Sequence, residues 1–96
     1  YEATSGRYAA FFLGQINQTR KNLDKAEIYY KKAVQFSESA EAFDTGYYHY
    51  SLLSLGEIAA RQGNKKKARE YFKKVKKHAS RGDRVHKEAR QKLKEL

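Results

Sequence analysis

The chain has 96 residues, enough for one small domain with a thin hydrophobic core. It contains no cysteine, which excludes disulfide frameworks and thiolate chemistry and leaves the redox compartment open. No apolar run reaches the roughly 18 residues of a membrane span, and no targeting segment is visible, so we expect a soluble domain of unknown location.

The formal net charge of +10 is concentrated in one half of the chain. Residues 1–48 hold six Lys/Arg and six Asp/Glu, whereas residues 49–96 hold 15 Lys/Arg and five Asp/Glu. Such asymmetry indicates either an acidic partner or a well-solvated helix face.

The first part of the chain predicts two helices. Apolar residues recur at spacings of three and four over about residues 2–20, and "KN" then breaks the pattern. A second helix should continue to about Phe36, with Asp24 as its cap and Glu27 in its first turn. The polar stretch "SESAEAFDTG" follows and predicts a break.

The remaining chain predicts three more helices and no strand. The third runs from Tyr47 to "QGN", where Gly63 is suited to end it and Asn64 to cap the next. The fourth carries an apolar stripe from Ala68 to Ala79 and ends at "SRGD". A last helix, capped by Asp83, reaches the end of the chain.

One stretch of the sequence occurs twice. "LGQINQTRKNLDKAEIYYKKAV" begins at Leu13 and "LGEIAARQGNKKKAREYFKKVK" at Leu55, and nine of the 22 aligned positions are identical. Each copy predicts a helix, a tight turn and a second helix. Because neither hairpin can bury its apolar side alone, the two copies are expected to stack.

The two copies resemble the tetratricopeptide repeat. The family has Leu-Gly in its first helix, then a small residue, an aromatic residue four positions later and a small residue three after that. The matching residues are Leu13-Gly14, Ala26, Tyr30 and Ala33, and then Leu55-Gly56, Ala68, Phe72 and Val75. The glycines are expected where two helices approach too closely for a side chain.

The resemblance covers about residues 7–82 and implies an all-α, TPR-like α-solenoid of five helices. Repeat one spans about 7–40, repeat two about 47–82, and a capping helix about 83–96, all within a single domain of residues 1–96. Three features depart from the family: Ala10 and Leu52 replace the first-helix aromatic, the closing proline is absent, and the copies are 42 residues apart rather than 34. The extra residues should lengthen the helix entering repeat two or form a loop around Asp44–Gly46.

The chain is expected to be the C-terminal part of a longer array. Ile28 and Val34 of repeat one become Glu70 and Lys76 in repeat two, so an apolar wall turns polar, as a terminal unit requires. The first helix shows no such replacement of apolar residues by polar ones. Self-association or the packing of preceding repeats is therefore expected on it.

No residue pattern is typical of an active site or a metal centre. His49, His78 and His86 lie on different predicted helices without metal-ligand spacing, and the carboxylates are scattered. The triplet Arg81–Asp83 reads as an adhesion motif or, alternatively, as a helix terminator and a cap. We therefore expect a protein that is not an enzyme and has no metal or cofactor.

The resemblance implies that the chain binds a peptide or partner segment in a concave groove lined by the first helices. Carried over by position, repeat one would contribute Tyr8, Phe11, Phe12, Gln15 and Gln18, and repeat two Tyr50, Leu53, Ser54, Glu57 and Arg61. Such a lining suits an extended or helical segment with apolar anchors. Phe11 and Leu53 fit equally well as core residues.

A second candidate surface is basic. Cationic residues of the fourth and last predicted helices, from Lys65 to Lys92 and beyond, lie opposite the apolar stripes and should point away from the groove. We take its main residues to be Lys66, Lys73, Lys74, Lys77 and Arg84. The alternative function is binding of nucleic acid or an anionic surface through phosphate contacts. The excess of lysine over arginine and the absence of interleaved exposed aromatics favour simple solvation.

Overall fold

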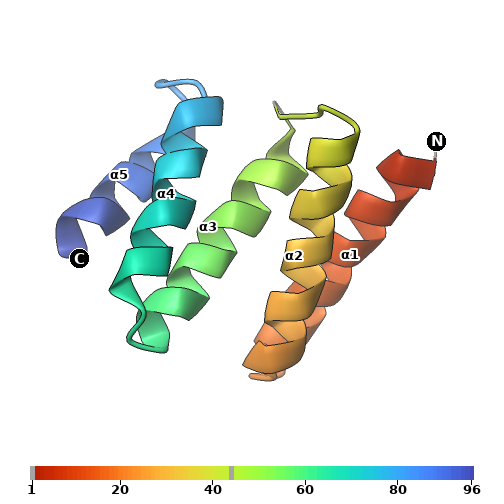
Figure 1. The fold of residues 1–96 in the computed structure, drawn as a ribbon, viewed down its shortest axis with the longest axis horizontal. Helices are drawn as coiled ribbons and strands as arrows, with labels where there is room; N and C mark the ends of the chain where they lie inside the picture. Colours follow the sequence, from red (N-terminus) through yellow and green to blue (C-terminus); the bar gives the residue numbers. More distant parts are fainter. Residues whose placement is uncertain (1, 44) are drawn as a thin grey trace.

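The computed structural model describes residues 2–43 and 45–96, except for the side chains of residues 2–5 and 7. This part of the chain forms five helices and no strand (Figure 1). The helices are α1 (Glu2–Thr19), α2 (Leu23–Ser39), α3 (Gly46–Arg61), α4 (Lys65–His78) and α5 (Arg84–Glu95). The predicted all-α solenoid of five helices is confirmed.

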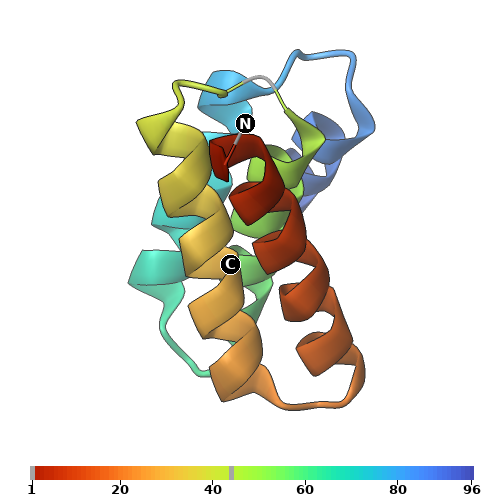
Figure 2. The same cartoon turned by 90° about the vertical axis from the view of Figure 1, so that its right-hand side faces the viewer.

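The helices form two layers. Each helix packs against the next one in the chain, and α1 also contacts α3, as α3 contacts α5. Figure 2 shows α2 and α4 on one side of the molecule, with α1, α3 and α5 on the other. The first helices of both repeats therefore share one layer, which positions their outward-facing residues side by side.

The turns inside the two hairpins have the same geometry. Gly63 has a φ of 80°, and the N–H of Asn64 donates to the carbonyl of Ala59 at 2.9 Å. Lys21, at the equivalent place in repeat one, has a φ of 60° although it is not a glycine. A residue in the left-handed conformation commonly ends a helix and lets the chain turn into the next one.

The predicted caps are partly confirmed. The N–H of Lys67 donates to Asn64 Oδ1 at 3.2 Å, so Asn64 does cap α4. The prediction for Asp24 is wrong, because α2 already begins at Leu23 with Asn22 at its cap position. Asp83 does occupy the cap position of α5, but its Oδ2 accepts from the N–H of Ser80 rather than from the helix.

The extra residues between the repeats are divided between helix and loop. Helix α2 continues past Phe36 to Ser39, and its last turn packs on α3, since Ser37 is fully buried and Glu38 accepts from the hydroxyl of Tyr48. A loop follows, and Thr45 Oγ1 accepts from the N–H of Tyr48 to start α3. Asp44, part of the predicted loop, lies outside the described residues.

Each hairpin is closed by an aromatic ring that sits on a glycine. A Cβ atom built on Gly14 would lie 2.7 Å from the ring of Tyr30, and one on Gly56 would lie 2.5 Å from the ring of Phe72. Both rings are almost completely buried. The close approach predicted at the two glycines is thus present, and the atoms that fill the space are those of the aromatic side chain four positions after the buried alanine.

The two hairpins are joined where α2 meets α3. Tyr48 of α3 donates its hydroxyl to Glu38 Oε2 of α2 at 3.0 Å, and Lys74 Nζ of α4 donates to the same oxygen at 3.3 Å. Burial, followed by the bond to Glu38, raises the pKa of Tyr48, so the phenol stays protonated. Val34 is buried as expected, whereas Ile28 is 53% exposed and forms no part of an apolar wall.

We expect Gly56→Ala to lower the free energy of unfolding by about 2 kcal/mol, because overpacking costs up to about 3 kcal/mol and helix propensity returns only about 1 kcal/mol. Gly14→Ala should behave alike. Chemical denaturation of each variant measures the effect.

The matched control is Gly82→Ala, since no atom lies within 4 Å of a Cβ added there. Its change should stay within about 0.5 kcal/mol, as for most surface substitutions. Equal losses at Gly56 and Gly82 would contradict the packing argument.

Candidate peptide-binding face

The predicted groove residues lie mainly along one side of the layer formed by α1 and α3. Tyr8, Phe12 and Gln15 are exposed on α1, while Tyr50 and Arg61 are exposed on α3 and Glu57 is half-buried there. We call the surface formed by these six residues the α1/α3 face. Because α1 and α3 are adjacent, side chains from both repeats can contact one bound segment.

An aromatic cluster joins the two helices of this face. The ring centroids of Tyr8 and Phe12 are 4.5 Å apart, and that of Tyr8 is 5.0 Å from Tyr47 of α3, both pairs in edge-to-face geometry. Phe11 lies 5.6 Å from the same Tyr47 ring. Tyr47 was missed by the sequence analysis. It precedes the residues that align with the groove positions, and only its aromatic character could have indicated its role.

Two of the predicted groove residues belong to the core instead. Phe11 and Leu53 are both buried, and Phe11 also contacts the ring of Tyr30. The groove prediction is therefore wrong for these two residues, and the core interpretation holds. The contact with Tyr30 places Phe11 against the second helix of its own hairpin rather than along the outer side.

Gln18, also predicted for the groove, is half-buried and bonded to α2. Its Oε1 accepts from the hydroxyl of Tyr30 at 2.6 Å. The pKa of Tyr30 is raised, chiefly because burial disfavours the phenolate. A hydrogen bond with the hydroxyl of Ser54 lowers the pKa in part, and the negative charge of Glu57 raises it slightly further. The phenol of α2 therefore remains a neutral donor between α1 and α3.

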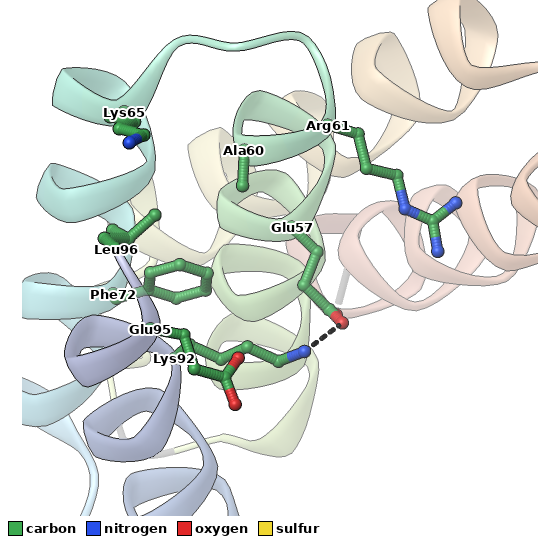
Figure 3. Close-up of a pocket in the computed structure, with 8 residues that line it drawn as sticks. All are labelled: Glu57, Ala60, Arg61, Lys65, Phe72, Lys92, Glu95 and Leu96. Carbon is green, nitrogen blue, oxygen red and sulfur yellow. Dashed lines mark ion pairs between the residues drawn. The ribbon is translucent and has the colours of Figure 1, made fainter.

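A pocket of about 340 Å³ opens at the other end of α3 (Figure 3). Its floor includes Phe72 and Ala60, and Leu96 closes one side. Charged side chains from three helices surround it: Glu57, Arg61, Lys65, Lys92 and Glu95. Lys92 Nζ lies 3.3 Å from Glu57 Oε2, an ion pair that ties α5 to α3. Both partners are about one third exposed, so this pair adds at most about 1 kcal/mol.

A second hollow, of about 290 Å³, lies where α3 and α5 begin. It is lined by Gly46, His49, Tyr50, Asp83, Arg84 and Val85. It brings Tyr50, predicted for the groove, beside Arg84, predicted for the basic surface. The two predicted surfaces thus meet at α5.

Three features of this structure can be compared with known families: the repeated hairpin, the ring on each glycine and the shared layer of first helices. The family model for the tetratricopeptide repeat matches residues 8–39 and 49–77. The chain belongs to the tetratricopeptide repeat family. No curated protein and no solved structure matches it. Members of this family generally act as protein-interaction modules and are typically not enzymes.

The basic residues of this tetratricopeptide repeat protein do not all point away from the α1/α3 face. Lys65 and Lys92 line the pocket beside Glu57 and Arg61, so that part of the prediction is wrong. The reason is the position of α5, which lies against α4 and reaches α3 with the long side chain of Lys92.

The basic surface itself is exposed. Lys66, Lys73 and Lys77 point into solvent, and among the described residues none of the three makes an ion pair. Lys74 pairs with Glu38, and Arg84 Nε lies 3.2 Å from Glu88 Oε1. The neighbouring aromatics are covered, since Tyr71 is half-buried and Phe72 is buried.

The described residues include neither a metal site nor a membrane-spanning helix. No group of three or more His, Asp or Glu side chains there is arranged to hold a metal ion. The helices within residues 2–43 and 45–96 include none that is long and apolar enough to cross a membrane.

We expect Tyr30→Phe to lower the free energy of unfolding by about 1 kcal/mol, because Gln18 would lose its hydrogen-bond donor while the ring keeps its place. Repeat two has Phe72 at the equivalent position, where its ring packs on Gly56 as the ring of Tyr30 packs on Gly14. The packing on the glycine is therefore compatible with phenylalanine. Thermal and urea denaturation measure the change.

The control is Gln18→Leu combined with Tyr30→Phe, which removes both partners. The double variant should recover part of the loss, because no buried polar group is then left unpaired. Strictly additive losses would contradict the role given to this bond.

Proposed function

We propose that this chain is a non-enzymatic interaction scaffold that binds a segment of a partner protein across the α1/α3 face. The segment is extended or helical and carries apolar anchors. The observation that supports this most directly is the exposure of three aromatic rings: 44% for Tyr8, 41% for Phe12 and 38% for Tyr50.

The aromatic cluster suits an apolar anchor. Tyrosine and phenylalanine offer large contact areas with few rotatable bonds, so little conformational entropy is lost when they are covered. Tyr8, Phe12 and Tyr47 already hold one another by edge-to-face contacts, and a bound side chain would meet a largely pre-arranged surface.

The pocket at the other end of α3 suits a polar or acidic residue of the same segment. Glu57 is paired with Lys92, so the remaining charged groups of the lining are Arg61, Lys65 and Glu95, with one positive charge in excess. An arginine can hold a carboxylate with two hydrogen bonds, whereas a lysine contributes a point charge. We therefore expect the preferred segment to combine an apolar anchor with an acidic residue further along.

The test uses a displayed library of random peptides selected on the immobilised protein. Enriched peptides should contain an aromatic or large aliphatic residue. In fluorescence-anisotropy titrations of the best peptide, Tyr8→Ala and Tyr50→Ala should each weaken binding about tenfold, since buried aromatic anchors are worth more than about 1 kcal/mol.

Ile28→Ala is the control, because Ile28 is also apolar and even more exposed but lies on α2. It should leave the dissociation constant unchanged. The proposal fails if no peptide is enriched, or if Tyr8→Ala and Tyr50→Ala bind as tightly as the unaltered chain.

A second candidate function is the binding of nucleic acid or an anionic surface by the basic surface. The exposed Lys66, Lys73 and Lys77, which make no ion pair with a described residue, favour it, while the covered aromatics beside them do not. If it is correct, binding to generic RNA or DNA should fall steeply with salt, and the variant Lys73→Glu/Lys77→Glu should abolish it. A flat response to salt or no retention on heparin would exclude this function.

A further inference from the structure

Polar side chains from three helices meet between α1 and α3. Gln18 of α1 and Ser54 of α3 are half-buried, and Tyr30 of α2 reaches them with its hydroxyl group. This hydroxyl donates to Gln18 Oε1 at 2.6 Å, and a hydrogen bond with Ser54 lowers the pKa of the same phenol. The group therefore joins the two first helices to the helix behind them, at a place where the α1/α3 face is not apolar.

The hydrogen bonds of this group run in one direction. The phenol of Tyr30 is neutral, because burial raises its pKa, so it has one proton to donate and an oxygen that accepts. Ser54 donates to that oxygen, and the phenolic proton goes to Gln18 Oε1. The amide of Gln18 is thereby held with its oxygen toward Tyr30 and its nitrogen pointing away.

The amide nitrogen of Gln18 offers hydrogen bonds that the chain does not use. Nε2 carries two N–H groups, and it donates to no described residue. It is not enclosed by the described residues either, so it reaches solvent between α1 and α3. Linked hydrogen bonds polarise one another, so the bond from Tyr30 strengthens these donors. An amide that is already oriented also loses little entropy when it binds.

We propose that Gln18 donates to a main-chain carbonyl of the bound partner segment, and that the segment is extended where it passes Gln18. A helix uses its main-chain carbonyls internally, except in its last turn, whereas an extended chain leaves them free. Tyr30 is a positioning residue, because it fixes the amide without touching the segment. This role rests on the proposed function and decides between the extended and the helical form of the segment.

A neutral carbonyl suits this place better than a charged group does. Glu57 adds negative charge near the hydroxyl of Tyr30, which disfavours an acidic side chain here. A cation would find no acceptor on Gln18, because Oε1 is occupied and Nε2 only donates. The main chain of a peptide supplies one neutral acceptor per residue.

The place of Gln18 on α1 sets a spacing within the segment. Gln18 follows Phe12 by six positions and Tyr8 by ten, which is about 9–15 Å along the helix axis at about 1.5 Å per residue. An extended chain covers this length in about three to five residues. The carbonyl that accepts from Gln18 should therefore lie about three to five residues from the apolar anchor.

Anisotropy titrations with the best peptide from the selection described above test this role. Gln18→Met removes the donors at nearly unchanged length and should weaken binding about fivefold, as expected for one neutral hydrogen bond. Gln18→Glu keeps an acceptor for Tyr30 but has no N–H to donate, and it should weaken binding at least as much. Gln35→Met, the same change at an exposed glutamine of α2, is the matched control and should leave the dissociation constant unchanged.

Tyr30→Phe tests the positioning role, because it releases the amide of Gln18 without altering a group that touches the segment. It should weaken binding about twofold in the otherwise unaltered chain, since the amide must then be ordered on binding. In the Gln18→Met background it should have no further effect. A purely structural role of Tyr30 would weaken binding equally in both backgrounds.

A scan of the peptide locates the carbonyl. Main-chain amides are replaced by esters one at a time, because the carbonyl of an ester is the weaker acceptor. One ester, about three to five residues from the anchor, should weaken binding to the unaltered chain but not to Gln18→Met. Nuclear magnetic resonance of the bound peptide should show an extended backbone at that residue.

The possible outcomes separate this role from the proposed function. If Tyr8→Ala and Tyr50→Ala weaken binding but Gln18→Met and Gln18→Glu do not, the segment binds across the face and the role of Gln18 is wrong. A bound peptide that is helical where it passes Gln18, or equal weakening by Gln35→Met, would also overturn the role. If no peptide is enriched, or neither tyrosine matters, the proposed function fails and the role of Gln18 fails with it.

Discussion

A helical hairpin has two apolar sides and can cover only one of them by itself. In this chain the inner side of each hairpin is closed by an aromatic ring on a glycine, Tyr30 on Gly14 and Phe72 on Gly56. The second side of the α3–α4 hairpin is covered by α2, and α5 closes the far end. The stacking of the helices follows from this need to bury the second apolar side of each hairpin. The same need decides which surfaces stay exposed.

The same requirement explains where binding is expected. The first helices must lie in one layer to stack, so their outward residues form a continuous face that the core does not use. The aromatic cluster and the charged pocket both lie on or beside this face.

The sequence was sufficient for the fold because the repeat encodes it twice. Matching glycines, alanines and aromatics predicted both hairpins and the helices within them. Features set by tertiary contacts were less predictable: the last turn of α2, beyond the predicted end, packs on α3 through Glu38 and Tyr48, and the placement of α5 turns Lys92 toward Glu57. The binding face was only partly predicted. Position in the repeat does not separate an outward residue from one such as Phe11 that turns inward, and it gave no weight to Tyr47.

The central claim is that identical residues of the two repeats differ because only one copy is covered. A soluble paramagnetic probe can measure this directly through the relaxation of methyl groups. The methyls of Leu13 and Ile16 should relax strongly, and those of Leu55 and Ile58 should be protected. Equal relaxation of the two pairs would contradict the account.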